Sequence, residues 1–190
     1  VAIMGESGSG KTTLLNILAS LDKPTSGAVR LSGGDITKIK DSKMSQFRRE
    51  HLGFVFQDFN LLDTLTLGEN IALALSIQKT PSEQIEPQVQ QAAAQLGIGD
   101  ILNKYPYQVS GGQKQRCACA RALVHTPKLI LADEPTGNLD SKTSRGVMEI
   151  MVRMAKRYHE TLIIVTHDVN IAKYADRIIN LHDGSIVSDE

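Results

Sequence analysis

The sequence GESGSGKT, residues 5–12, lies between a short apolar run, VAIM at 1–4, and an expected helix. It matches the pattern G-x-x-x-x-G-K-[ST], whose glycines let successive backbone amides point at phosphate oxygens. In this pattern the lysine, Lys11, reaches the β- and γ-phosphates of a nucleotide, and the hydroxyl of Thr12 binds Mg²⁺. The stretch therefore predicts a nucleotide-binding loop with these members: Gly5, Ser7, Gly8, Ser9, Gly10, Lys11, Thr12 and Thr13.

Short apolar or β-branched runs recur along the chain and predict further strands. They are AVRL (28–31), LGFVF (52–56), LILAD (129–133), LIIVT (162–166), RIINL (177–181) and SIV (185–187). Several of these runs are apolar on both faces, as in a parallel sheet that is covered by helices. Helices are expected after Lys11 and at 142–158 and 169–174, and HDG at 182–184 is typical of a tight hairpin turn. The alternation predicts an α/β fold of the P-loop NTPase (RecA-like) type, with a parallel sheet core.

The interval 58–118 has a different composition from the rest of the chain. It is rich in Leu, Ala and Gln, contains no convincing strand, and is punctuated by Pro81, Pro87 and Pro106. We expect a small helical subdomain inserted into the α/β core. The core is then predicted to consist of 1–57 and 119–190, with the helical subdomain at 58–118.

Polar residues follow several of the expected strands. Asp133 and Glu134 stand at the end of LILAD, and His167 follows LIIVT. Gln57 follows LGFVF in the same way. Because ligands of parallel sheets gather at the carboxyl edge, Asp133 and Gln57 are candidates to bind Mg²⁺ beside Thr12. Glu134 is a candidate base for an attacking water, and His167 for contact with the γ-phosphate or that water.

The stretch VSGGQKQR, residues 109–116, presents a second phosphate-facing helix start. A hydroxyl residue, Ser110, and two glycines, Gly111 and Gly112, precede Gln113 and an expected helix. Bare amides at a helix N-terminus, with the positive end of the helix dipole behind them, form an anion site. A single nucleotide does not explain why one chain carries two such sites a hundred residues apart. The second site therefore raises the question of which molecule it serves.

Composition excludes some classes of function. The chain of 190 residues has 21 basic and 21 acidic side chains, so bulk charge indicates no nucleic-acid or acidic-lipid partner. The longest apolar runs are too short to cross a bilayer. The only cysteines, Cys117 and Cys119, are expected on different faces of one helix, which fits a reducing cytosol. The first residues already form a strand-like run, so we expect an upstream segment of the same domain.

Six motifs follow one another along the chain: GESGSGKT, Gln57, SGGQ, LILADEPT, NLD and His167. Together, and over essentially the whole chain, they resemble the ATP-binding cassette of ABC transporters. The resemblance implies ATP hydrolysis with Mg²⁺, and a head-to-tail homodimer with two ATP molecules between the subunits. It implies that Ser110, Gly111, Gly112 and Gln113 bind the γ-phosphate of the ATP held by the partner. Asp140, in NLD, resembles the residue that crosses the dimer interface and couples the two sites. In the family an aromatic residue that stacks on adenine lies in an antiparallel segment upstream of VAIM, so we expect no residue of 1–190 to be assigned to base stacking.

The resemblance also implies a transmembrane permease as partner and a place at the cytoplasmic face of the membrane. Its contact surface is expected in the helical subdomain and just after Gln57, where apolar residues crowd: Phe59, Leu61, Leu62, Leu65 and Leu67. GFVFQDFNLLDTLTLGENI (53–71) and YADRI (174–178) resemble the subfamily for macrolide export, lipoprotein release and bacitracin-type peptide resistance. Efflux or resistance to antimicrobial peptides is therefore the expected role.

Other classes with the same motifs stay open. A cell-division or other non-transport ABC ATPase shares much of this wording. A DNA-repair ATPase carries a long coiled coil between the positions that correspond to Gln57 and Ser110. Here that interval, 58–109, is too short for such a coiled coil. A non-hydrolysing cassette is disfavoured because Lys11, Glu134 and His167 are all present. A ribosome-bound factor would need two cassettes in tandem.

Overall fold

The computed structural model describes residues 1–190 and contains one six-stranded sheet in the order β4-β5-β6-β1-β7-β8. All neighbouring strands in it are parallel except β8, which is antiparallel to β7. The strands are β1 (Ala2–Met4), β4 (Leu52–Phe56), β5 (Leu129–Asp133), β6 (Thr161–Thr166), β7 (Ile178–His182) and β8 (Ser185–Asp189). The α/β fold with a largely parallel sheet is thus confirmed.

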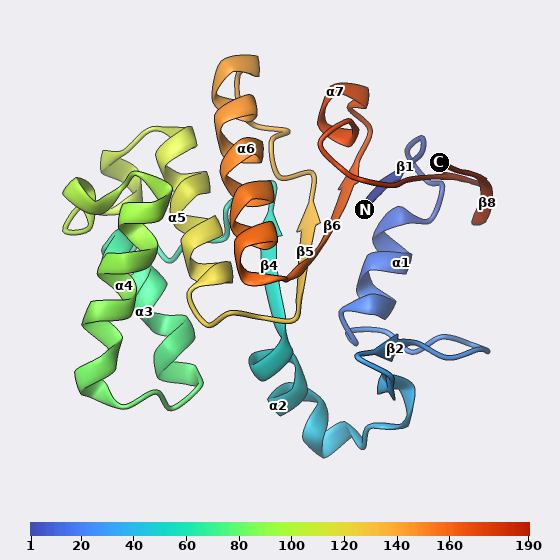
Figure 1. Ribbon diagram of the computed structural model, residues 1–190, viewed down its shortest axis with the longest axis horizontal. Helices are drawn as coiled ribbons and strands as arrows, with labels where there is room; N and C mark the ends of the chain where they lie inside the picture. Colours follow the sequence, from blue (N-terminus) through green and yellow to red (C-terminus); the bar gives the residue numbers. More distant parts are fainter.

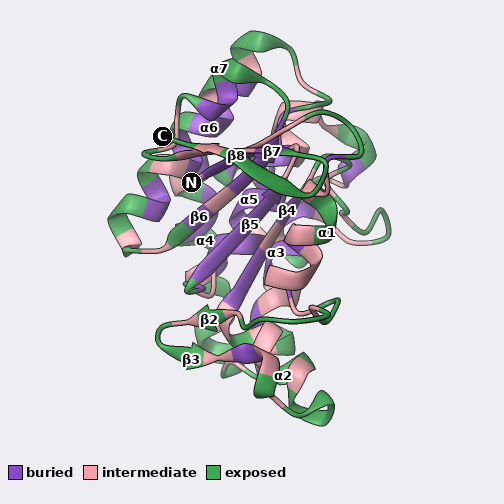
Figure 2. Ribbon diagram, turned by 90° about the vertical axis from the view of Figure 1, so that its right-hand side faces the viewer, coloured by how far each residue is buried: buried purple, intermediate pink, exposed green.

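Helices cover the sheet, which explains why its central strands are apolar on both faces. The helices of this layer are α1 (Lys11–Leu18), α2 (Asp41–His51), α6 (Ser141–Tyr158) and α7 (Val169–Ala172). In β5 the consecutive residues Ile130, Leu131 and Ala132 are all buried, as a two-sided cover requires. Figure 2 shows the buried strands inside a more exposed helical layer.

The helical lobe stands beside the edge strand β4 (Figure 1). It consists of α3 (Leu67–Ile77), α4 (Ser82–Leu96), α5 (Gly111–Leu123) and two short 3₁₀ turns, η2 (Gly99–Ile101) and η3 (Pro106–Gln108). Thr66 and Glu69 form a capping box that starts α3, and α4 ends at Gly97 in the left-handed conformation. Helix α5 crosses the boundary predicted at 118/119. Five of its buried residues belong to one cluster that includes both Val55 of β4 and Ile71 of α3; they are Cys117, Cys119, Ala120, Ala122 and Leu123.

Two local expectations differ from the structure. Only Arg30–Leu31 of the run 28–31 is a strand, β2, and it pairs with β3 (Gly34–Asp35) in a separate two-stranded sheet. Helix α2 was not expected at all, because none of its residues is buried and its sequence therefore shows no apolar stripe. A 3₁₀ turn, η1 (Ile36–Lys38), connects these two parts.

The predicted hairpin between β7 and β8 is present. Asp183 and Gly184 both adopt positive φ angles, of 47° and 75°, as a two-residue turn of the primed type requires.

The cysteines are free and buried, and burial raises the pKa of both Cys117 and Cys119 to about 12. Among the helices there is none with the length and apolar character needed to span a bilayer.

Candidate functional site

The parallel topology brings four predicted segments to one edge of the sheet. The loop 5–12 leaves β1, His167 leaves β6, the pair Asp133 and Glu134 leaves β5, and Gln57 leaves β4. Residues from all four segments line one cavity of about 690 Å³. The sequence-based grouping of these side chains is therefore what the structure shows.

The loop 5–12 presents free amides to this cavity. Gly10 is the N-cap of α1 with a φ of 96°, and no side chain caps the first turn of the helix. The first amides of α1 therefore remain available to an anion, with the positive end of the helix dipole behind them. At Gly5 a Cβ atom would lie 2.4 Å from the carbonyl oxygen of Leu181, so this position accepts only glycine.

Lys11 closes the loop. Its Nζ donates to the carbonyl oxygens of Gly5 and Glu6, at 2.7 Å each, and lies 3.5 Å from Oγ of Ser9. An ammonium has three donors and two are firmly used, so one remains for a phosphate oxygen. The lysine thus shapes the loop and presents a positive charge in the same cavity.

The oxygen groups at this edge fit Mg²⁺. Asp133, the hydroxyl residue Thr12 and Gln57 all line the cavity. Burial and the charge of Glu134 raise the pKa of Asp133, and Lys11 opposes this shift. A cation beside Asp133 would therefore be favourable. Mg²⁺ prefers a few hard oxygen ligands together with water and phosphate, which is the kind of donor set found here.

Glu134 is held by three groups. Its Oε2 accepts from the Thr166 hydroxyl (3.1 Å), and its Oε1 accepts from the amide of His167 (3.0 Å) and lies 2.7 Å from Nδ1 of that residue. Because a carboxylate only accepts, Nδ1 must carry the proton in this pair. The carboxylate side chain is 19% exposed and the imidazole 74%, so Glu134 is sheltered while His167 faces the open side.

The backbone at Glu134 is strained. Its φ is 43°, and it precedes Pro135, which disfavours compact conformations of the preceding residue. Such a conformation costs about 1–3 kcal/mol and persists only where the surroundings impose it. Here the amide of Glu134 donates to Val165, and its carbonyl accepts from Gly137. Strain of this kind is common where a side chain must be aimed at a substrate.

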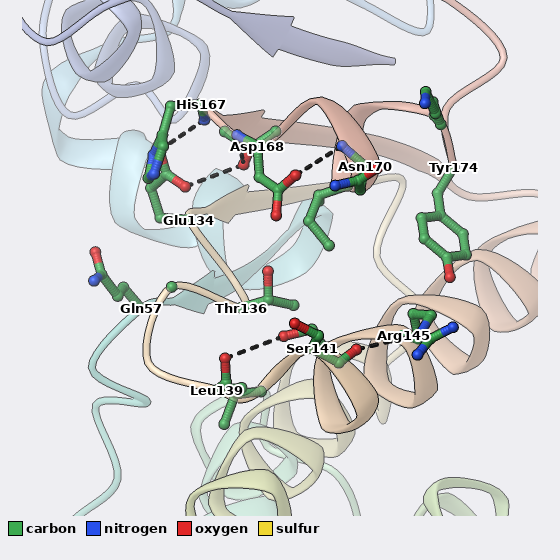
Figure 3. Close-up of a pocket in the computed structure, with 15 residues that line it drawn as sticks. Gln57, Glu134, Thr136, Leu139, Ser141, Arg145, His167, Asp168, Asn170 and Tyr174 are labelled. Atoms are coloured by element: carbon green, nitrogen blue, oxygen red, sulfur yellow. Dashed lines mark hydrogen bonds and ion pairs between the residues drawn. The ribbon is translucent and has the colours of Figure 1, made fainter.

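A second polar cavity, of about 650 Å³, adjoins the first and shares Gln57, Glu134 and His167 with it. Figure 3 shows Glu134 and His167 together at one end and Arg145 and Tyr174 at the other. Glu134 therefore lies where the nucleotide cavity meets a water-accessible polar space.

Gln57 is paired with a residue that sequence reasoning did not single out. Its Nε2 donates to Oδ1 of Asn138 (3.2 Å), and Nδ2 of Asn138 donates back to the carbonyl of Gln57 (3.1 Å). This leaves the amide oxygen of Gln57 without a protein donor. A Cβ atom at Gly137 would lie 2.8 Å from Nε2 of Gln57, so this glycine allows the pair to form. Asn138 and Thr166 were missed because a polar residue beside a motif gives no signal of its partner.

The predicted second anion site lies elsewhere. None of Ser110, Gly111, Gly112 and Gln113 lines either cavity. Ser110 is the N-cap of α5: its Oγ accepts from the amide of Gln113 (3.3 Å), and Oε1 of Gln113 accepts from the amide of Ser110 (2.9 Å). This capping box uses the acceptor of the Ser110 hydroxyl but not its proton. The amides of Gly111 and Gly112 have no acceptor within the helix.

Asp140, predicted to couple the two sites of a dimer, caps helix α6 in this chain. Its Oδ1 accepts from the amides of Lys142 and Thr143, at 3.0 Å each, and the Thr143 hydroxyl donates to its Oδ2. The hydrogen bonds from Thr143 lower the pKa of Asp140. The first turns of α5 and α6 touch, since a Cβ atom at Gly112 would lie 2.4 Å from Cγ2 of Thr143.

The segment expected to meet a permease is only partly at the surface. Leu62 is exposed, whereas Leu67 is fully buried in the lobe and is excluded from such a surface. Phe59 and Asn60 both have positive φ angles, and their carbonyls accept from the guanidinium of Arg121. An apolar hollow of about 350 Å³ lies nearby, between α2, β4 and α3. Its lining residues are Leu21, Arg48, Arg49, Leu52, Phe54, Phe56, Ala74, Ile77 and His125.

Comparisons with known proteins agree with this geometry. Residues 1–137 match the family model described as ABC transporter. The ABC transporter ATP-binding protein YxdL of Bacillus subtilis (strain 168) is 52% identical over 188 residues, which are 99% of this chain and 73% of YxdL. The bacitracin export ATP-binding protein BceA of Halalkalibacterium halodurans is 49% identical, over 98% of this chain and 74% of BceA.

A solved structure with a TM-score of 0.88 and 40% identity covers 100% of this chain, which matches 83% of that one. It is the ATP-binding cassette MJ0796 in a dimeric post-hydrolysis state, bound to ADP and phosphate. With a phosphate-binding loop, paired acids and a matching family model over more than half its length, the chain belongs to the ABC transporter family, as an ATP-hydrolysing, nucleotide-binding subunit.

Proposed function

We propose that this subunit hydrolyses Mg-ATP between two copies of itself, arranged head to tail, and drives a permease that exports antimicrobial peptides. The proposal of a dimer rests on the separation of two sets of phosphate-binding groups within one chain. One cavity holds the loop 5–12, Asp133 and Glu134, while the free amides of Gly111 and Gly112 lie outside it. A site that needs both sets of donors is then completed by a second chain.

Within one subunit the loop binds and orients the triphosphate. The uncapped amides of α1 and the Nζ of Lys11 bind the β- and γ-phosphate oxygens, which fixes the γ-phosphorus for in-line attack. Thr12, Asp133 and Gln57 would hold Mg²⁺, which would neutralise the charge that develops on these oxygens. The raised pKa of Asp133 supports that position for the cation.

Glu134 accepts the proton of the attacking water. Its Oε1 accepts from the amide and from Nδ1 of His167, and its Oε2 accepts from Thr166, so one acceptor position remains, on Oε2. Because Nδ1 of His167 donates to Glu134, Nε2 of the neutral ring can accept from the attacking water, and it can donate to a γ-phosphate oxygen only in the doubly protonated ring. His167 therefore orients the base and, through Nε2, can contact the water or the phosphate.

The signature residues at the start of α5 bind the γ-phosphate of the ATP held by the second copy. They are Ser110, Gly111, Gly112 and Gln113. Ser110 accepts from Gln113 within its own helix and can still donate its hydroxyl proton to a phosphate oxygen. With the amides of Gly111 and Gly112, this gives three donors at a helix N-terminus. Asp140 lies at the start of α6 against the start of α5, from where it can pass a change at one site to the other.

The permease is proposed to dock between the lobe and the core, which places the subunit at the cytoplasmic face of the membrane. The apolar hollow there lies between α2, β4 and α3, and two basic side chains, Arg48 and Arg49, are among its lining residues. Phe59, Leu61, Leu62 and Leu65 follow Gln57 and are proposed to extend the same surface. The peptide class of cargo rests on the similarity to BceA, whose name describes bacitracin export.

Replacing Glu134 by Gln tests the catalytic role. The amide keeps the size of the side chain but is a far weaker base, so we expect turnover to fall by about 10²–10⁴-fold. ATP affinity should stay within about twofold, because the phosphates are bound by Lys11 and the loop. Steady-state hydrolysis and equilibrium titration with a fluorescent ATP analogue measure the two quantities.

Glu149→Gln is the matched control, because Glu149 is an exposed acid on α6 outside both cavities. It should leave turnover unchanged. Unchanged turnover in Glu134→Gln, or loss of ATP binding with it, contradicts the proposed base.

A further inference from the structure

Helix α5 runs alongside the edge strand β4 and is packed against its backbone. A Cβ atom at Gly53, near the start of β4, would lie 2.5 Å from the carbonyl oxygen of Ala122, near the end of α5. At the other end of the contact, the side chain of Gln115 reaches the carbonyl of Phe56, the last residue of β4. The helix and strand are therefore antiparallel, and the signature end of α5 lies at the nucleotide edge of the sheet (Figure 1).

Gln115 is the one polar side chain of α5 that is fully buried, with 0% exposure. Its Nε2 donates to the carbonyl oxygen of Pro135 at 2.5 Å and to that of Phe56 at 3.3 Å. Both partners can only accept, so the amide nitrogen must face them and its two protons serve one carbonyl each. The amide oxygen, Oε1, is buried without a partner. An unpaired buried acceptor is unfavourable, so the residue is retained here at a cost to stability.

The two carbonyls that Gln115 holds belong to the two loops that act on the γ-phosphate. Phe56 directly precedes Gln57, and Pro135 directly follows the strained residue Glu134. No other protein group donates to the carbonyl of Pro135. Gln115 is therefore the only polar link from α5 to the backbone that aims Glu134. Farther along α5, Arg121 holds the carbonyls of Phe59 and Asn60, on the other side of Gln57.

We propose that Gln115 is a positioning residue for hydrolysis, which sets Glu134 and Gln57 relative to the signature helix of the same chain. This rests on the proposed function, in which Glu134 is the base and Gln57 a ligand of Mg²⁺. Through Gln115, a displacement of Gln57 or Glu134 at one ATP moves the N-terminus of α5, which faces the ATP of the second copy. A displacement of about 1 Å at a reacting group is enough to lower a rate by about 10²-fold, so one lost tether should be visible in turnover.

The test compares two neighbouring tethers on α5. Gln115→Met keeps the length of the side chain and removes both donors. Arg116→Met is the matched control, because Arg116 also donates from α5 to a backbone carbonyl, that of Leu96, but Leu96 ends a lobe helix away from the cavity. We expect kcat of Gln115→Met to fall by about tenfold or more, with ATP affinity within about twofold of wild type. Arg116→Met should lower the unfolding midpoint and keep kcat within about twofold.

Gln115→Glu adds a readout that a purely structural residue would not move. An ionised carboxylate cannot donate to either carbonyl, whereas a protonated one can donate to one of them. The ratio of kcat for Gln115→Glu to that of wild type should therefore rise as the pH falls from about 8 to about 6. This variant is informative even if Gln115→Met folds poorly, because the comparison is made within one protein.

The inference is overturned if Gln115→Met retains wild-type kcat, if Arg116→Met loses as much kcat as Gln115→Met, or if the pH ratio is flat. Failure of the proposed function is distinguished by Glu134→Gln. If that variant retains turnover, the assignment of the base is wrong. If it is inactive while Gln115→Met is fully active, only the role of Gln115 is wrong.

Discussion

Glu160 is a partly buried acid that has no part in the proposed reaction. Both of its carboxylate oxygens are buried without a hydrogen-bond partner, and burial raises its pKa from the ordinary value of 4.5 to about 7. Below pH 4.5 the group is protonated in the folded and the unfolded chain, so the full stability is present. Between these values the unfolded chain releases the proton first, and the free energy of unfolding falls as pH rises.

Glu160→Gln should remove this dependence. Because the side chain is partly exposed, we expect Glu160→Gln to raise the free energy of unfolding at pH 8 by about 1 kcal/mol. This corresponds to a rise of about 2–4 °C in the unfolding midpoint for a chain of this size. Thermal unfolding of both proteins at about pH 4.5 and pH 8 measures the effect. Glu149→Gln, on an exposed face of α6, is the control and should shift neither midpoint. Equal gains for Glu160→Gln at both pH values would contradict the titration of a buried carboxyl as the cause.

The residues of the candidate site differ in how far the sequence predicts them. The type and order of Lys11, Asp133 and Glu134 predict the chemistry at the sheet edge, because each belongs to a motif with fixed spacing. The left-handed backbone at Glu134 and the buried donor at Gln115 could not be predicted in this way. Both depend on contacts between segments that are far apart in the chain, and a local pattern carries no information about such partners.

At the scale of elements, predictions succeeded where one physical rule determines the outcome. The two-sided apolar runs became the central strands of the parallel sheet, and Asp183 and Gly184 made the expected turn. Helix α2 was missed because it buries no residue. The strand at 28–31 was predicted too long because only Arg30 and Leu31 find partners, in a two-stranded sheet apart from the main one. The extent of the helical lobe, 58–118, stays a prediction, since α5 packs on both parts.

The hollow between the lobe and the core yields a prediction about assembly. Ile77, from the end of α3, lines it and is 50% exposed, so Ile77→Asp should leave the fold and the ATPase activity of the free subunit intact. A carboxylate in an apolar contact is costly, and we expect co-purification with the permease from membranes to fall by about tenfold or more. Immunodetection of the subunit in purified permease measures this.

Val187→Asp is the control, since Val187 lies on β8 at the far edge of the sheet and is 64% exposed. It should assemble as wild type does. Leu62→Asp then tests whether the segment after Gln57 extends the same surface. Normal assembly of Ile77→Asp would show that the permease docks elsewhere.

The whole molecule contains two helix starts that are predicted to bind phosphate, and the two are built differently. Helix α1 begins at Gly10 without a side-chain cap, and its amides open into the nucleotide cavity. Helix α5 begins with a complete capping box and lies outside that cavity. The cap and the proposed phosphate contact make different demands on Ser110, because the cap needs only an acceptor oxygen, whereas a phosphate needs a donor. A substitution that keeps the cap but repels phosphate does separate them.

Ser110→Asp is such a substitution. Aspartate is as good an N-cap as serine, so the stability of α5 should be kept, whereas its charge opposes a γ-phosphate and it has no hydroxyl proton to donate. In a Glu134→Gln background, where turnover is blocked, ATP should convert the parent protein to a dimer in sedimentation velocity. Ser110→Asp should bind ATP through its own Lys11 and Thr12 and remain a monomer. Ser82→Asp, at the exposed start of lobe helix α4, is the matched control and should dimerise normally. If Ser110→Asp also dimerises with ATP as its parent does, Ser110 is a helix cap only, and the second anion site does not act on a partner's nucleotide.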